Sequence, residues 1–207
     1  MDYKYSKNML IGIKGKMGAG KTTSSSILKK NYQCIEYAMA QPIKEIAKIL
    51  GFTETELYGT QCQKLKPNAY WGVSAREFLQ KFGTDICRDY LPTKIPQMNN
   101  PWIRCFEIFC KQNHSENIIV SDIRFLDEAN AIKKCGGIII EIYKTPKGKN
   151  ACENVSDFET GEFHDPEFHA SETEMDQIKV DYIIKNDQSL EFLQEELLRV
   201  VIKHYLI

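Results

Sequence analysis

Short apolar runs alternate with longer amphipathic stretches along the chain, and this alternation predicts strands separated by helices. The runs expected to form strands are residues 9–13, 34–38, 117–122, 138–143 and 180–184. Most of them are rich in isoleucine or valine, as buried strands are. Strands that alternate with helices form a parallel sheet covered on both faces. The expected fold class is therefore α/β, a three-layer parallel sheet of about five strands with helices on both faces.

The expected helices show apolar residues at spacings of three and four. They cover residues 22–30, 42–50, 74–90, 102–111, 125–135 and about 189–205. Pro42 begins the second helix, and Ser74 with Glu77 forms a capping-box pattern at the third, although Gly83 interrupts that helix. Asp187 or Ser189 is expected to cap the last one. The polar segment 145–175 is predicted to be a mobile flap.

The clearest chemical pattern lies between the first strand and the first helix. Residues 15–22, GKMGAGKT, match G-x-x-x-x-G-K-[ST], the phosphate-binding P-loop. Its glycines allow backbone angles that turn successive N–H groups toward an anion. Lys21 is predicted to reach the β and γ phosphates, and the Thr22 hydroxyl to ligate Mg²⁺. Because the loop follows a strand and opens a helix, a chance glycine-rich turn is disfavoured. The predicted ATP-binding residues here are Gly15, Lys16, Met17, Gly18, Ala19, Gly20, Lys21, Thr22 and Thr23.

Size and charge narrow the function classes. The chain has 207 residues, 43% apolar and 27% charged, which suits one α/β domain. A formal net charge of −1 gives no reason to expect nucleic acid as a partner. The longest apolar runs are too short to span a membrane. Seven cysteines without a CxxC pair, and a polar N-terminus without a secretory leader, predict reduced thiols and a cytoplasmic location.

Several charged residues fit phosphoryl transfer. Asp122 follows an apolar strand, where it is expected to hold Mg²⁺, the alternative being a cap for the next helix. Arg76 and Arg124 have no obvious partner in sequence; each either neutralises phosphate charge or is a surface arginine. Lys16 is expected near the phosphates, and Lys16, Lys21 and Arg124 are the predicted catalytic cations. Lys14 either lies near the phosphates as well or simply ends the strand.

Other polar and aromatic residues are ambiguous. His164 and His169, with Asp165 and Glu172, do not have the spacing of a compact zinc site, so a flap or structural role is favoured. Trp102, Tyr70 and Trp71 are expected either to stack on a base or to pack in a core.

Further segments occur in an order that marks a family. They are AQPIK at 40–44, SAREFLQKFGTD at 74–85, Trp102, SDIR at 121–124 followed by Glu128-Ala, HASE at 169–172 and NDQSL at 186–190. With the P-loop, they make the chain resemble deoxynucleoside monophosphate kinases of the T-even bacteriophage type, also found in large DNA viruses. The resemblance runs over nearly the whole chain. The P-loop is generic, but the 76–85 segment together with Asp-x-Arg is specific.

The resemblance implies a P-loop nucleoside monophosphate kinase-like fold, a single domain of residues 1–207 with an acceptor-binding region at about 37–113 and a lid at about 145–176. It implies Mg²⁺-dependent transfer of the ATP γ-phosphoryl group to a deoxynucleoside monophosphate, giving the diphosphate. The acceptor-binding residues that it implies are Lys44, Arg76, Gln80, Asp85, Trp102 and Arg124. Asn186 would lie near the ATP adenine. If the source is viral, the host cytoplasm is the expected location.

Two departures from the family pattern concern the acceptor site and the lid. The segment 51–73 is much shorter than in the phage-type enzyme, which leaves the base preference open. Lys144, Lys147 and Lys149 stand where the family commonly supplies an arginine; a lysine keeps the charge but loses the bidentate fork.

Three rival functions stay open. One is a kinase of another small acceptor, such as dephospho-coenzyme A or phosphomevalonate. Another is a nucleotide-hydrolysing switch, although Lys185-Asn-Asp187 has the wrong order for the guanine-specific N-K-x-D pattern. The third is a non-catalytic binding protein, which the intact Lys21, Thr22 and Asp122 disfavour. A homodimer is common for such kinases, but no stretch of this chain requires one.

Overall fold

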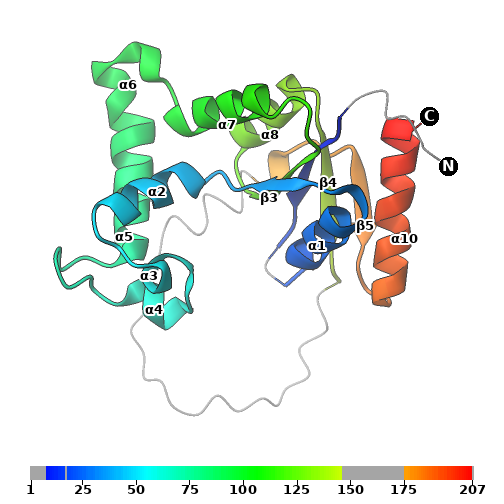
Figure 1. The fold of residues 1–207 in the computed structure, drawn as a ribbon, viewed down its shortest axis with the longest axis horizontal. Coiled ribbons are helices and arrows are strands. Elements are labelled where there is room, and N and C mark those ends of the chain that lie inside the picture. Colours follow the sequence, from blue (N-terminus) through cyan, green and yellow to red (C-terminus); the bar gives the residue numbers. More distant parts are fainter. Residues whose placement is uncertain (1–7, 17, 146–174, 207) are drawn as a thin grey trace, which may run out of the picture. The chain divides into compact units, whose positions relative to one another are not determined.

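The computed structural model describes residues 8–16, 18–145 and 175–206. The chain divides into two units (Figure 1). The first comprises residues 1–36 and 115–207, and the second comprises residues 37–114. Each unit is described by itself.

The first unit is built on a five-stranded sheet with the order β2-β3-β1-β4-β5. The strands are β1 (Leu10–Lys14), β2 (Ile35–Tyr37), β3 (Ile118–Ile123), β4 (Ile138–Tyr143) and β5 (Tyr182–Lys185). The central strand β1 pairs in parallel with β3 and β4, and β4 pairs in parallel with β5. All five residues of β1 are buried, which explains why its sequence is almost continuously apolar. The predicted α/β class with about five strands is confirmed.

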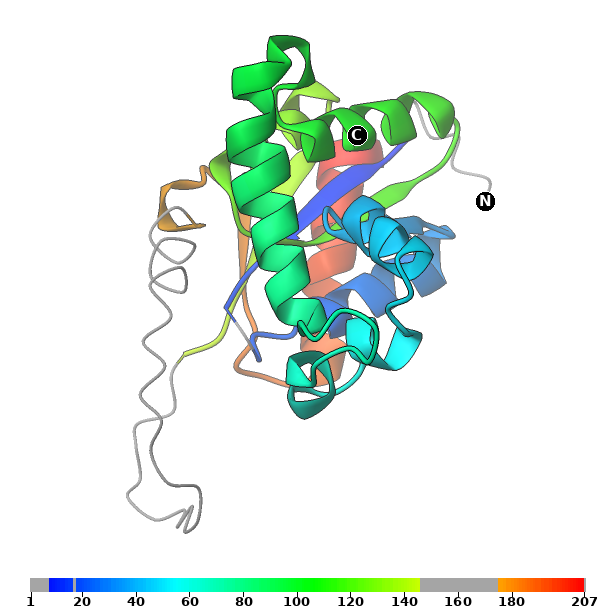
Figure 2. The same ribbon diagram turned by 90° about the vertical axis from the view of Figure 1, so that its left-hand side faces the viewer.

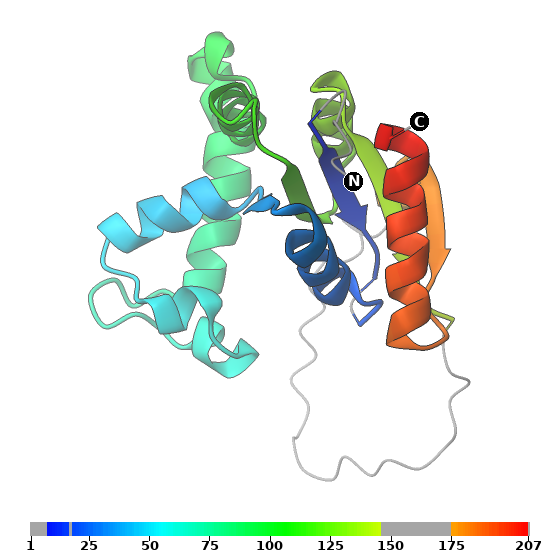
Figure 3. The ribbon, with the colours of Figure 1, turned by 45° about the vertical axis from the view of Figure 1, so that its right-hand side comes forward.

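Alternate residues of β1 face different helices. Ile11 and Ile13 belong to a core that includes Ile27 and Leu28 of α1 (Lys21–Tyr32), with Leu193 and Leu197 of α10 (Leu190–Val201). Gly12 points to the opposite face, where a Cβ would lie 2.9 Å from Ile132 of α8 (Leu126–Lys134). Helices therefore cover both faces of the sheet, as predicted, and Figure 3 shows α1 and α10 along one side of the strands.

The end of the chain is tied to the central strand. Helix α10 continues into the π-helical segment η3 (Ile202–Leu206), and the buried Tyr205 hydroxyl donates to the Leu10 carbonyl at 2.8 Å. The predicted helix to about Tyr205 thus spans both segments.

The second unit is helical. Its elements are α2 (Gln41–Ile49), α3 (Glu54–Tyr58), α4 (Gln61–Leu65), α5 (Ala75–Gln80), η1 (Lys81–Tyr90), α6 (Leu91–Lys94), η2 (Pro96–Met98) and α7 (Pro101–Gln112). The short helices α3 and α4 each begin with a capping box, from Thr53 and Thr60 respectively. The predicted helix 74–90 is α-helical to Gln80 and π-helical beyond it, and α5, η1 and α6 form one long rod (Figure 2).

The glycine that interrupts this helix has a packing role. A Cβ at Gly83 would lie 2.6 Å from the Ile43 side chain of α2. The missing side chain therefore lets α2 approach the rod closely. Phe106 of α7 is fully buried and contacts Tyr37 with ring centroids 5.4 Å apart, which gives the unit an aromatic centre.

Among the described residues, no helix combines the length and apolar character that a membrane crossing needs.

Replacing Leu197 by alanine should lower the free energy of unfolding by about 2–5 kcal/mol, because this fully buried side chain would leave a cavity in the core of the first unit. Leu190→Ala is the matched control, because Leu190 lies in the same helix but is 56% exposed. This substitution should lower the free energy of unfolding by about 0.5 kcal/mol or less. Urea unfolding measures both; equal losses would contradict the core assigned to α10.

Candidate active site

The predicted phosphate loop connects β1 to α1 at the carboxyl edge of the sheet. Gly15, Gly18 and Gly20 have positive φ values of 155°, 77° and 109°. Helix α1 begins at Lys21 directly after Gly20. The chain turns here through angles that favour glycine, as the loop pattern requires. Met17, predicted to lie in the loop, is outside the described residues.

Two of these glycines are also required by close packing. A Cβ at Gly15 would collide with the backbone carbonyl oxygen of Ile142 in β4. A Cβ at Gly20 would collide with the side-chain amide of Asn186, which follows β5. The loop is therefore held against the ends of two neighbouring strands, and both contacts depend on a bare Cα.

Lys21 closes the loop on itself. Its ammonium group donates to the carbonyl oxygens of Gly15 at 2.6 Å and Lys16 at 3.2 Å. The Lys16, Thr22 and Thr23 side chains are exposed at the same end of α1. The first turn of α1 has no acidic residue, so the positive end of the helix dipole is not offset locally. This arrangement suits a phosphate chain.

Lys14 ends β1 inside the protein. It is 3% exposed, and its ammonium group lies 3.5 Å from Glu141 Oε1 on the neighbouring strand β4. Lys14 and Glu141 are direct partners in the strand register. Glu141 could not be recognised from the sequence, because its pairing depends on which strand lies next to β1.

Asp122 is in β3, next to its last residue, as the sequence predicted. Asp122 is not the N-cap residue of the following helix. Phe125 is the N-cap of α8, and the Glu128 carboxylate accepts hydrogen bonds from the backbone N–H groups of Arg124 and Phe125. Arg124 itself is exposed in the turn between β3 and α8.

The turn after β5 contacts the loop directly. Asn186 Nδ2 donates to the Ala19 carbonyl oxygen at 2.8 Å. The next residue, Asp187, accepts from the backbone N–H of Thr145 at 2.8 Å and from the Thr145 hydroxyl. These hydrogen bonds, with Lys185 beside them, lower the pKa of the Asp187 carboxyl to about 2. Asn186 was predicted near the adenine, whereas the roles of Asp187 and Thr145 were missed.

The predicted acceptor residues other than Arg124 lie on the second unit. Arg76 and Gln80 are half-buried on α5, one helical turn apart, and Asp85 is exposed on η1. Trp102 Nε1 donates to the Gly83 carbonyl oxygen at 2.8 Å, which anchors α7 to the rod. Lys44 lies 4.2 Å from the ring centroid of Tyr58.

Tyr70 and Trp71 lie on the surface of the second unit. They are 82% and 56% exposed, so the core-packing alternative is wrong for both side chains. Trp71 Nε1 donates to the Leu50 carbonyl oxygen at 2.6 Å, which attaches this loop to the end of α2.

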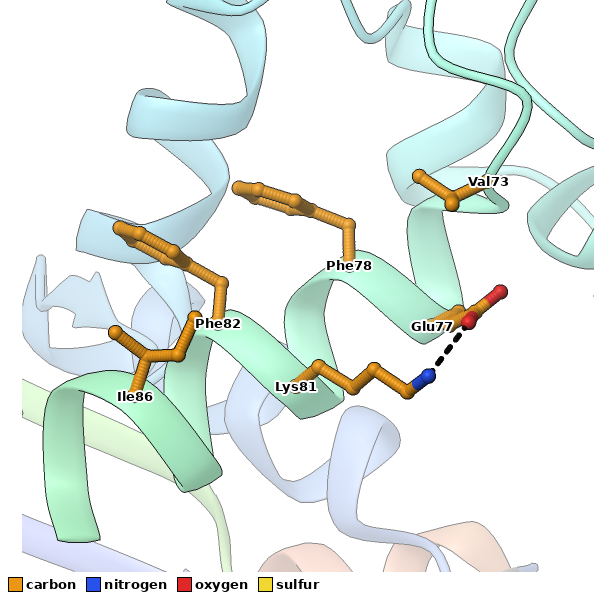
Figure 4. Close-up of a pocket in the computed structure, with 6 residues that line it drawn as sticks. All are labelled: Val73, Glu77, Phe78, Lys81, Phe82 and Ile86. Atoms are coloured by element: carbon orange, nitrogen blue, oxygen red, sulfur yellow. Dashed lines mark hydrogen bonds and ion pairs between the residues drawn. The ribbon is translucent and has the colours of Figure 1, made fainter. Parts of the chain in front are cut away.

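A solvent-open apolar pocket of about 190 Å³ lies along α5 and η1 (Figure 4). Its walls are Val73, Glu77, Phe78, Lys81, Phe82 and Ile86. Phe78 and Phe82 stack with ring centroids 5.1 Å apart, and Lys81 pairs with Glu77 at 2.9 Å. None of the predicted acceptor residues lines this pocket.

Some predicted features lie outside the described residues. They are Lys147, Lys149, His164, Asp165, His169 and Glu172, with most of the predicted lid at 145–176. Within the described part of the chain, no three His, Cys, Asp or Glu side chains gather as a metal site. The six cysteines that are described are free thiols.

Comparison with known proteins agrees with the resemblance found in the sequence. The family model described as deoxynucleotide monophosphate kinase matches residues 52–197. A protein of Acanthamoeba polyphaga mimivirus that carries the name deoxynucleotide monophosphate kinase is 38% identical over 141 residues, which is 65% of this chain and 73% of that protein.

Solved structures give weaker likenesses. Shikimate kinase from Aquifex aeolicus has a TM-score of 0.48 and 14% identity, with 93% of this chain and 96% of that one covered. Dephospho-CoA kinase from Campylobacter jejuni has a TM-score of 0.42 and 18% identity, with 95% and 97% covered. At these values, the likenesses say nothing about the acceptor of this chain.

Asp187→Asn should change how stability depends on pH. The Asp187 carboxyl has a lowered pKa in the folded state, so it stabilises the fold above its ordinary pKa of 3.8, and this contribution is lost as pH falls toward about 2. The urea midpoints of the wild type and the variant should therefore differ by a constant amount above about pH 5 and converge below about pH 4. A difference that is unchanged at pH 3 would contradict the pairing with Thr145.

Proposed function

The chain belongs to the deoxynucleotide monophosphate kinase family, and from this premise we propose that it transfers the γ-phosphoryl group of ATP, with Mg²⁺, to a deoxynucleoside monophosphate. The product is the deoxynucleoside diphosphate. The observation that carries the proposal is the loop of residues 15–22, whose three positive-φ glycines stand between a buried central strand and the start of a helix.

The loop supports a nucleoside triphosphate as donor. Its backbone N–H groups and the start of α1 supply positive potential to the phosphate chain. The Lys21 ammonium lies at the loop, within hydrogen-bond distance of the Gly15 carbonyl, and we expect it to turn toward a phosphate oxygen when the donor binds. Lys16 adds a second cation on the same loop.

The residues at the sheet edge fit a hard divalent cation. Mg²⁺ prefers oxygen ligands and is held by one or two carboxylates with phosphates and water. We assign Thr22 and Asp122 to it, because Thr22 is exposed at the start of α1 and Asp122 stands near the end of β3. When bound, the ion neutralises charge on the phosphate oxygens.

The second unit carries the proposed acceptor site. Arg76 offers a guanidinium fork for the acceptor phosphate, and Gln80 lies one turn further along the same helix. Lys44, Asp85 and Trp102 complete the part of the implied set that lies on this unit. We expect residues 51–73 to influence the base preference, because this segment helps form the acceptor pocket in the phage-type enzyme and is shorter here.

The proposed chemistry is an in-line displacement. A phosphate oxygen of the acceptor attacks the γ-phosphorus, and the bond from that phosphorus to the bridging oxygen of ADP breaks. The attacking oxygen is already anionic, so no strong general base is needed. Lys21, Lys16 and Arg124 lower the barrier by neutralising negative charge that spreads over the transferred group.

The direct test is a phosphoryl-transfer assay. The purified protein, ATP and Mg²⁺ are incubated with each deoxy- and ribonucleoside monophosphate in turn, and the diphosphate is followed by chromatography. We expect at least one deoxynucleoside monophosphate to be converted far faster than ATP is hydrolysed. Hydrolysis of ATP without any diphosphate product would instead favour a switch protein, and no transfer to any nucleotide would refute the acceptor assignment.

Lys21→Ala should lower kcat at least about 10²-fold, because it removes the cation placed nearest to the transferred phosphoryl group. The thermal midpoint should stay close to that of the wild type. Lys30→Ala, an exposed lysine near the end of the same helix, is the matched control and should retain activity. A wild-type rate for Lys21→Ala would remove this lysine from the mechanism.

Arg76→Ala should raise KM for the acceptor about tenfold or more while KM for ATP changes little, because the lost fork binds only the acceptor phosphate. The acceptor KM of Arg76→Lys should lie between those of the wild type and Arg76→Ala, since a lysine keeps the charge without the fork. The control is Arg104→Ala, an exposed arginine on α7 of the same unit. Equal increases in both KM values would contradict the acceptor assignment.

A further inference from the structure

The turn that follows β5 is hydrogen-bonded both to the end of β4 and to the phosphate loop. The backbone N–H of Asn186 donates to the Tyr143 carbonyl oxygen at 2.7 Å, which continues the pairing of β5 with β4. Its side-chain amide donates to the Ala19 carbonyl oxygen at 2.8 Å and covers the bare Cα of Gly20. A glycine at position 20 is thus needed for Asn186 to come this close.

The bond to Ala19 sets the direction of one loop peptide. In a trans peptide, the carbonyl oxygen and the following N–H point in opposite directions. Because Asn186 holds the Ala19 carbonyl on its own side, the Gly20 N–H points away from Asn186. In a P-loop this N–H is one of the donors that surround the phosphate oxygens.

The neighbouring residue ties a second segment to the same turn. The Asp187 carboxylate accepts two hydrogen bonds from Thr145, one from its backbone N–H and one from its hydroxyl, and lies 3.1 Å from the Lys185 ammonium. Thr145 is two residues beyond the end of β4. One turn therefore holds both the phosphate loop and the chain that leaves β4.

We propose that Asn186 and Asp187 are positioning residues of the donor site: Asn186 orients the Ala19–Gly20 peptide toward the donor phosphates, and Asp187 holds the exit of β4 beside it. This inference rests on the proposed function, because it takes a nucleoside polyphosphate as the ligand. It differs from a contact with adenine, since an effect through the loop concerns the phosphate chain whatever base is attached.

The test measures binding of ADP by calorimetry and inhibition of the kinase by inorganic tripolyphosphate, a probe without a base. Asn186→Ala should weaken both about tenfold, because one hydrogen bond that orients the loop is lost. Asn186→Asp, which has nearly the same shape, should weaken both further, because a carboxylate repels the Ala19 carbonyl. Thr145→Val, which keeps the backbone N–H, should weaken both about threefold.

Gln188→Ala is the matched control, an exposed residue of the same turn that should bind both ligands like the wild type. Thermal unfolding without ligand shows whether each variant is folded. If the Asn186 variants are folded and bind ADP within twofold of the wild type, the positioning role is wrong. If they lose ADP but not tripolyphosphate, Asn186 reads the base and the proposal is also wrong. A wild type that binds no ADP or ATP refutes the proposed function instead.

Discussion

Close backbone packing around the phosphate loop is the constraint on which the rest of the first unit depends. The loop leaves a strand whose five residues are all buried, and it must turn at once to start α1. Gly15 lies against the Ile142 carbonyl, and Gly20 lies against Asn186. Neither position has space for a Cβ, so a single residue type satisfies the backbone angle and the packing together. These contacts hold the loop backbone close to β4 and to the turn after β5.

The alternation of side chains along β1 supports the loop from below. Ile11 and Ile13 are completely buried against α1 and α10, while Gly12 lets α8 approach the other face. Because β1 is central and clamped on both sides, the strand that delivers the loop has little freedom to move. Lys14 extends this ordering to the edge of the sheet through Glu141.

In the second unit, the corresponding constraint is the packing around the π-helical segment η1. Its long rod is π-helical from Lys81 to Tyr90, and π-helical segments are often found at functional sites. Gly83 lies within this stretch, where it admits Ile43 of α2 and accepts the Trp102 indole N–H through its carbonyl. The residues proposed for the acceptor flank this glycine on both sides in sequence. The apolar pocket uses other residues of the same rod.

Local information in the sequence determined the elements and the loop. Strand length, helical spacing, caps and the P-loop pattern involve neighbouring residues, so the strands and the longer helices could be predicted. The short helical segments α4, α6 and η2 were not predicted. The family resemblance came from the same source, because its motifs are short and ordered. The π-helical geometry after Gln80 was not predicted, since helical spacing alone does not distinguish it from an α-helix.

Only the tertiary structure decided which distant residues meet. Asn186 and Ala19 are 167 positions apart, Asp187 and Thr145 are 42 apart, and Trp102 and Gly83 are 19 apart. Such pairs depend on the order of strands in the sheet and on how closely helices pack. Neither of these can be predicted from the pattern of neighbouring residues. The sequence by itself therefore identified the loop that can bind phosphates. Which distant side chains contact this loop was determined only by the tertiary structure.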